Sequence, residues 1–149
     1  MSVTLLHRQG FKRILVAVDG SEVSLRAAEH AARIARQDGA QIFALHVVQA
    51  PPFEAVGELA EYYNIARRES KKWMKETEAV AESNGLALKT ETIVGAFSVV
   101  ETIIGYAESS SIDLIVSGTR GKTPSSRMRL GSVASGLVEY AGCAVLVVR

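Results

Sequence analysis

Short apolar runs alternate with helix-like segments along this chain, and this alternation is the strongest constraint on its fold. Residues 14–18 form an unbroken apolar run rich in β-branched side chains, and residues 143–148 form another. Continuous apolar runs of this length are typical of strands that are buried on both faces of a parallel sheet. Strands that alternate with helices therefore predict a parallel sheet covered by helices on both faces.

The same reasoning assigns the remaining segments. We predict strands at residues 14–18, 41–48, 86–94, 112–117 and 143–148. Helices are expected at residues 22–37, with Ser21 as N-cap and Gly39 as stop, after the capping box at residues 98–101, and at residues 133–140. Residues 54–84 form either one long helix or an irregular piece followed by a helix. The third strand alternates in polarity, which is typical of an edge strand.

These elements predict one domain over residues 1–149, a size that suits a single hydrophobic core. The expected fold is α/β: a doubly wound open sheet of five parallel strands in the order 3-2-1-4-5, with right-handed crossovers.

A basic, glycine-marked stretch follows the fourth predicted strand. Residues 118–132 read GTRGKTPSSRMRLGS and contain four basic side chains and no acidic one. Glycine lets a ligand approach the main chain closely, and a helix N-terminus offers unpaired N–H groups. A strand that leads through such a loop into a helix is suited to hold phosphate. The alternative is an ordinary solvated loop whose glycines only make turns.

Two distant segments are expected to meet at one edge of the sheet. In doubly wound sheets, ligands bind at the carboxyl ends of the strands where the strand order reverses. Asp19 follows the first strand and Gly118 follows the fourth, so both are expected there. The Asp19 carboxylate would accept a hydrogen bond from a ribose hydroxyl or adenine amine, or hold a metal ion beside phosphates. Alternatively, Asp19 only caps a turn. Asp113 and His46 are expected to be structural.

Two common nucleotide motifs are excluded. Gly121-Lys122-Thr123 matches the end of a Walker A loop, but the leading glycine of that motif would fall at Val116. The glycine fingerprint of dinucleotide-binding domains is also missing, because no glycine occurs between Gly20 and Gly39.

Composition narrows the class of protein further. A net charge of +1 argues against a general nucleic-acid binder. The single cysteine, Cys143, excludes an internal disulfide and is expected to be buried and inert. No apolar run approaches the length of a membrane span and no signal peptide is evident, so we expect a cytoplasmic protein.

The spacing Gly118-x2-Gly121-x9-Gly131-Ser132 resembles the ATP-binding motif of universal stress proteins. Residues 14–21, 45–48, 94–95, 113–118 and 143–148 also resemble segments of that family, so the resemblance covers nearly the whole chain. It implies an adenine nucleotide alpha hydrolase-like fold.

The resemblance also implies roles for individual residues. The adenine and ribose would be contacted by Ala17, Asp19 and Val47, with Val18 beside them. Ser117 and Gly118 would line the turn under the nucleotide, and the phosphates would be held by Gly121, Gly131, Ser132 and Val133. The Ser132 hydroxyl would cap the following helix or bind a phosphate oxygen. From charge alone we add Arg120, Lys122, Arg127 and Arg129 to the phosphate-binding residues.

The functional prediction that follows is an ATP-binding protein that acts as a nucleotide-dependent stress-response switch or interaction module, with Mg²⁺ held by Asp19 together with ATP. The alternative is a slow ATP hydrolase or a nucleotidyl-transferring enzyme of the same fold. A receiver-type signalling domain is disfavoured, because residues 94–95, Val-Gly, stand where its phospho-acceptor aspartate is required. The resemblance further implies a homodimer joined through the last strand, Ala144–Val148, whose apolar edge would need covering.

Overall fold

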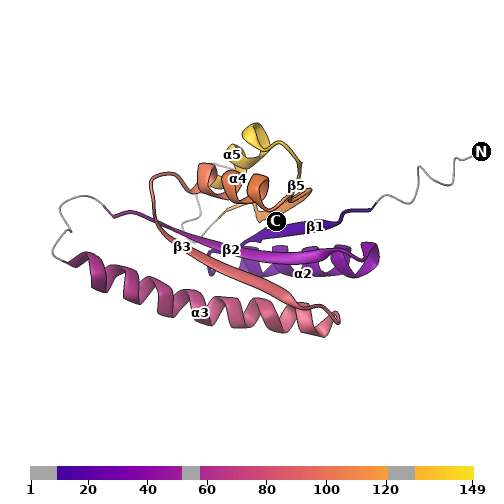
Figure 1. Ribbon diagram of the computed structural model, residues 1–149, viewed down its shortest axis with the longest axis horizontal. Coiled ribbons are helices and arrows are strands. Elements are labelled where there is room, and N and C mark those ends of the chain that lie inside the picture. Colours follow the sequence, from indigo (N-terminus) through magenta and orange to yellow (C-terminus); the bar gives the residue numbers. More distant parts are fainter. Residues whose placement is uncertain (1–9, 52–57, 121–129) are drawn as a thin grey trace, which may run out of the picture.

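The computed structural model describes residues 10–51, 58–120 and 130–149. Its centre is a sheet of five parallel strands in the order β3-β2-β1-β4-β5 (Figure 1). The strands are β1 (Arg13–Ala17), β2 (Gln41–Gln49), β3 (Leu88–Ala96), β4 (Leu114–Gly118) and β5 (Ala144–Val148). The predicted strand order is confirmed, including the position of β3 at an edge.

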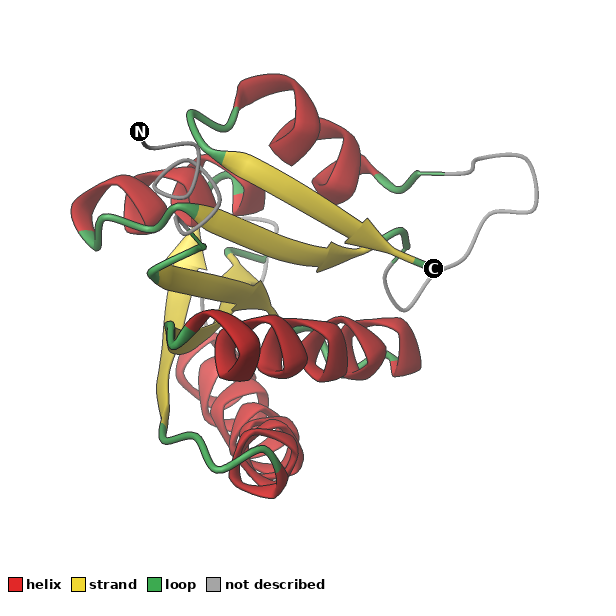
Figure 2. Ribbon diagram, turned by 90° about the vertical axis from the view of Figure 1, so that its right-hand side faces the viewer, coloured by secondary structure: helices red, strands yellow, loops and turns green. Residues whose placement is uncertain are grey.

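Two helices cover each face of the sheet (Figure 2). Helices α2 (Glu22–Asp38) and α3 (Leu59–Ser83) pack on one face, and α4 (Val99–Ser109) and α5 (Ser132–Tyr140) pack on the other. Strand residues divide between the two layers by simple alternation. Ile14 and Val16 of β1 face α2, whereas Leu15 joins the cluster under α4 and α5.

The predicted caps are found at helices α2 and α4. The Ser21 hydroxyl accepts a hydrogen bond from the Ser24 N–H at 3.1 Å, and the Ser98 hydroxyl accepts one from the Glu101 N–H at 3.2 Å. Gly39 ends α2 in the left-handed conformation, with φ of 69°. These caps satisfy backbone groups that would otherwise lack partners at the helix ends.

Three expectations need correction. Strand β3 begins at Leu88 rather than at residue 86, and β4 begins at Leu114 rather than at residue 112. The reason is that strand ends are set by pairing with the neighbouring strand, as Ile42 with Leu88 and Ile14 with Leu114. Ser132 does not cap α5: Gly131 occupies the N-cap position, and within the described residues no side chain caps this helix.

The open question about residues 54–84 is settled for the part that the structure describes. From Leu59 to Ser83 the chain forms one continuous helix of 25 residues, whose buried positions are Ser70, Met74, Thr77 and Ala81. Across the described ranges, no helix is both long and apolar enough to cross a membrane.

Candidate functional site: a cleft at the switch point of the sheet

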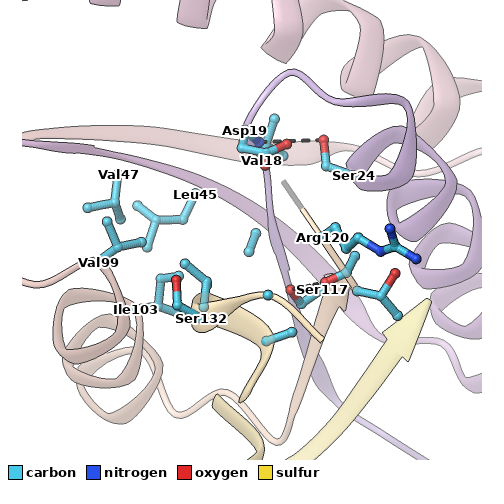
Figure 3. Close-up of a pocket in the computed structure, with 16 residues that line it drawn as sticks. Val18, Asp19, Ser24, Leu45, Val47, Val99, Ile103, Ser117, Arg120 and Ser132 are labelled. Carbon is cyan, nitrogen blue, oxygen red and sulfur yellow. Dashed lines mark hydrogen bonds between the residues drawn. The ribbon is translucent and has the colours of Figure 1, made fainter. Parts of the chain in front are cut away.

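A cleft opens at the carboxyl edge of the sheet, where β1 lies between β2 and β4 (Figure 3). It has a volume of about 290 Å³. Ten of the fourteen predicted binding residues line this switch-point cleft: Ala17, Val18, Asp19, Val47, Ser117, Gly118, Arg120, Gly131, Ser132 and Val133. The other four, Gly121, Lys122, Arg127 and Arg129, lie outside the described residues.

The cleft has a mostly apolar part between β2 and α4. Leu45 and Val47 contribute from β2, and Val99 and Ile103 contribute from α4 (Figure 3). Leu45 and Ile103 are almost fully buried, so this wall belongs to the hydrophobic core. A flat apolar group such as a nucleobase can be covered by such a surface without leaving a polar group unpaired.

The opposite part of the cleft is formed by the first turn of α5. Ser132, Val133 and Ala134 are the first three residues of the helix, and all three line the cleft. Because this first turn lines the cleft, its N–H groups and the positive end of the helix dipole face the cleft, and no side chain of the described residues caps them. This is the arrangement that binds anions at helix N-termini.

A main-chain contact closes the loop that separates β4 from α5. The Gly131 N–H donates a hydrogen bond to the Thr119 carbonyl at 2.6 Å, and the Thr119 N–H donates to the Val148 carbonyl at 2.8 Å. The ends of the loop therefore lie side by side, next to the edge strand β5. The Gly131 N–H is used inside the protein, so the main-chain N–H groups that remain for an anion at this helix end are those of α5.

Asp19 has a structural role in addition to its place in the cleft. Its Oδ1 atom accepts hydrogen bonds from the Ser21 N–H at 2.9 Å and from the Ser21 hydroxyl at 2.5 Å. The Ser24 hydroxyl in turn donates to the Ser21 carbonyl at 3.0 Å. This network fixes the turn between β1 and α2, so the turn-capping role of Asp19 is confirmed; the residue also lines the cleft, and its predicted contact with a nucleotide or metal ion stays a prediction (Figure 3).

Gly118 is required for close packing beneath the cleft. A Cβ atom placed on Gly118 would lie 2.5 Å from Cγ1 of Val23, in the first turn of α2. The neighbouring Ser117 is buried and donates its hydroxyl hydrogen to the Gly118 carbonyl at 3.0 Å. The glycine therefore lets the first turn of α2 pack closely against the end of β4, beside the cleft.

Metal binding finds little support within the described residues. No group of three histidine, cysteine, aspartate or glutamate side chains gathers there, and the carboxylate that lines the cleft is that of Asp19. A single carboxylate suits Mg²⁺ only when phosphate oxygens and water complete its coordination. Asp19 thus fits a shared Mg²⁺–phosphate site and not an independent metal site.

Six lining residues were missed from the sequence: Ser24, Leu45, Val99, Ile103, Thr119 and Ala134. For three of them the spacing along the strand or helix indicated a shared face. Leu45 stands two residues before Val47 on the same face of a strand, and Val99 and Ile103 are spaced by one helical turn. Their contribution to one cleft follows from the packing of α4 over β2, which no local pattern specifies.

Asp113 and His46 have the structural roles expected of them, whereas Cys143 is half-buried and not buried as expected. Asp113, at the amino edge of the sheet, accepts hydrogen bonds from the Lys12 and Arg13 N–H groups, both at 2.9 Å. His46 is buried on the far face of β2, against the ring of Trp73. Cys143 is half-buried; burial foremost, and then the charge of Asp113, raise the pKa of its thiol.

Comparison with known proteins identifies the family of the chain and agrees with its fold. Residues 10–149 match the universal stress protein family. Universal stress protein MJ0531 of Methanocaldococcus jannaschii is 38% identical over 142 residues, which cover 93% of this chain and 82% of that protein. Universal stress protein UspA from Lactobacillus plantarum superposes with a TM-score of 0.84 at 32% identity, covering 95% of this chain and 99% of that one.

Two more distant structures contain adenine nucleotides. A universal stress protein in complex with cAMP has a TM-score of 0.72 and 22% identity, and covers 95% of this chain and 99% of its own. The universal stress protein from Archaeoglobus fulgidus in complex with dAMP has a TM-score of 0.70 and 21% identity, and covers 95% of this chain and 100% of its own. At this identity the likeness establishes the shared fold.

Proposed function

The chain belongs to the universal stress protein family, and on that premise we propose that it binds an adenine nucleotide, ATP foremost, in the switch-point cleft and uses the bound state as a switch. The observation that carries the proposal is the junction of an apolar wall with an uncapped helix N-terminus in one cleft. An adenine nucleotide needs both surfaces, one for the base and one for the phosphates.

Each part of the nucleotide has a matching part of the cleft. The base lies against Val47 and Val99, and the ribose hydroxyls donate to the second oxygen of Asp19, because Oδ1 is engaged with Ser21. The phosphates lie at the first turn of α5, over the N–H groups of Ser132 and Val133. Two distant relatives of the same fold were solved with cAMP and dAMP, which supports an adenine nucleotide as the ligand.

ATP is preferred to a monophosphate because of the charge around the cleft. Arg120 lines the cleft, and residues 121–129 add Lys122, Arg127 and Arg129 in the sequence without an acidic residue. Each added phosphate brings negative charge to this basic segment, so affinity rises from AMP to ATP. Where Mg²⁺ accompanies ATP, the Asp19 carboxylate would be its ligand from the cleft in place of the ribose contact, and phosphate oxygens and water would complete its coordination.

The protein acts as a homodimer in this proposal. Strand β5 forms an edge of the sheet, and an exposed strand edge is prone to pair with another chain. Val138 and Tyr140 of the adjacent helix α5 are 54% and 67% exposed, so apolar surface adjoins that edge. Antiparallel pairing of two β5 strands around a two-fold axis covers the strand edge and the apolar surface beside it. Sedimentation at micromolar concentration then gives twice the mass of one chain; a monomer there contradicts this part of the proposal.

Calorimetric titration of nucleotide-free protein tests the nucleotide site. Adenosine, AMP, ADP and ATP, each with and without Mg²⁺, separate the contribution of the base from that of the phosphates. Affinity is expected to increase along this series. No heat of binding with any of the four would refute the proposal, and equal affinity for adenosine and ATP would remove the phosphate site from it.

A matched pair of variants locates the site. Asp19→Asn keeps an Oδ1 acceptor for Ser21 and removes the charge, so the turn is retained while affinity falls about tenfold, as expected for a lost hydrogen bond to a charged group. Glu108→Gln removes a charge from the exposed end of α4 outside the cleft and leaves affinity unchanged. Equal losses in both variants would place the nucleotide elsewhere.

A further inference from the structure

A second cavity lies on the opposite face of β2 from the switch-point cleft. Leu45 and Val47 of this strand face the cleft, and the alternate residues His46 and Val48 face α3. Between these residues and the first half of α3 is a space of about 260 Å³, the α3 cavity. Helix α3 runs along β2 and β3 on that side (Figure 1).

Three aromatic rings take part in the lining of the α3 cavity. His46, Tyr62 and Trp73 all contribute to it. The ring of Trp73 meets that of His46 edge-on, with centroids 5.0 Å apart, and the ring of Tyr62 meets that of Tyr63 edge-on at 5.4 Å. The Tyr62 hydroxyl donates to the Gln49 carbonyl at 3.3 Å, which holds this ring at the end of β2. Contacts outside the cavity therefore hold the ring of Tyr62 in place, whereas the rings of His46 and Trp73 hold each other.

The charged member of the lining is a carboxylate. Glu69 of α3 lines the cavity, and no lysine or arginine of the described residues does. Glu69 is exposed and forms no ion pair within the described part of the chain, although Arg68 and Lys72 are near it in sequence. The remaining lining is hydrocarbon, including Val48 and Ile65. The cavity opens to solvent, because Tyr62 and Ile65 are 40% and 44% exposed.

We propose that the α3 cavity binds a small organic ammonium cation, whose apolar body lies among the rings and whose charge faces Glu69. The faces of aromatic rings carry negative potential and attract cations, and this attraction grows when the cation leaves water. A carboxylate beside the rings adds a Coulomb attraction and repels anions such as nucleotides. The site is distinct from the switch-point cleft and does not depend on nucleotide binding there.

Trp73 makes this proposal directly measurable, because it is the one tryptophan of the chain. The probe pair is choline, a quaternary ammonium ion, and 3,3-dimethyl-1-butanol, its neutral carbon isostere. Both are titrated against nucleotide-free protein at pH 8 and constant ionic strength while Trp73 fluorescence is recorded. Choline is expected to produce a saturable change with a dissociation constant about tenfold lower than that of the neutral alcohol.

Variants on α3 separate the contributions of ring and charge. Tyr62→Leu keeps an apolar side chain but removes a ring, and Glu69→Gln removes the charge; each should weaken choline binding several-fold. Glu82→Gln, on the same helix and far from the cavity, should bind choline as the unmodified protein does. Far-UV circular dichroism shows that the variants compared are folded.

Three results would overturn the proposal: no saturable response to choline, equal affinity for the neutral alcohol, or unchanged choline affinity in both Tyr62→Leu and Glu69→Gln. The first rejects the site, the second makes it a purely apolar cavity, and the third places choline elsewhere. None of them bears on nucleotide binding, which is measured separately in the switch-point cleft.

Discussion

Replacing Gly20 with alanine should destabilise the protein more than any ordinary glycine substitution in a turn. Gly20 follows Asp19, and its φ is 84°, in the left-handed region that disfavours side chains. A Cβ atom there would also lie 2.2 Å from Cε2 of Trp73. The backbone strain costs about 1–2 kcal/mol, and the forced movement of a packed ring costs about 1–3 kcal/mol. The free energy of unfolding should thus fall by about 2–5 kcal/mol.

Urea denaturation followed by far-UV circular dichroism measures this change. Gly39→Ala is the matched control, because Gly39 also has a positive φ, 69°, but no atom lies within 4 Å of the position of its Cβ. It should lose only the strain contribution, about 1–2 kcal/mol. The loss in the free energy of unfolding caused by Gly20→Ala must be larger than the loss caused by Gly39→Ala; equal losses would refute the contact between Gly20 and Trp73.

A double-mutant cycle separates the two contributions to the Gly20 effect. In a Trp73→Leu background the ring is gone, so Gly20→Ala should cost no more than Gly39→Ala does. An unchanged cost in that background would show that the ring of Trp73 does not limit the space at Gly20. The reasoning about the turn that carries Asp19 would then be wrong.

Three further predictions concern the cleft and its surroundings. Gly118→Ala should lower the free energy of unfolding by about 1–3 kcal/mol, because its Cβ would lie 2.5 Å from Val23, and urea denaturation measures this loss. Adding Val23→Ala should restore much of the lost free energy; no restoration would contradict the packing argument. Ser21→Ala removes the N-cap of α2 and should cost about 0.5–2 kcal/mol by the same assay; an unchanged midpoint contradicts a capping role. Cys143 should react with iodoacetamide more slowly than free cysteine at pH 7.5, because the thiolate is the reactive form and the pKa of this thiol is raised. Its reaction rate should increase as the pH rises through that pKa. A rate above that of free cysteine at pH 7.5 would contradict the raised pKa.

Local chemistry made much of this fold predictable. Ser21, Ser98 and Gly39 mark helix ends by hydrogen bonds and backbone angles that involve only neighbours in the chain, and all three act as predicted. The apolar run at residues 14–18 lies within one residue of β1 at each end. Strand β3 was misplaced at its start, because its end is fixed by its register with Ile42 on β2.

The part of the candidate site that could be predicted consists of residues placed by the strand order of the sheet. Asp19 follows β1 and Gly118 ends β4, on either side of the switch point, so the topology alone brings them to one edge. Of the four residues of the apolar wall only Val47 was predicted, because Val99 and Ile103 reach the cleft through the packing of α4. The role of Gly131 as the N-cap of α5 was also missed, since Gly and Ser are both good N-caps and the sequence does not decide between them.

The α3 cavity illustrates what sequence periodicity does not show. Tyr62, Glu69 and Trp73 are spread over three turns of a charged helix, and the apolar spacing there predicts only a packed stripe. Their meeting with His46 depends on the distance between α3 and β2. That distance is set by tertiary packing, including the ring of Trp73 against Gly20.

The central claim is that one adenine nucleotide spans the apolar wall and the first turn of α5. Nuclear magnetic resonance of labelled, nucleotide-free protein tests it most directly, by following the amide signals of Ser132 and Val133 and the methyl signals of Val47 and Val99 as ATP is added. We predict that both groups of signals shift together and saturate at one equivalent, while adenosine shifts chiefly the methyl signals. Shifts confined to other surfaces, or no shift at saturating ATP, would contradict the account.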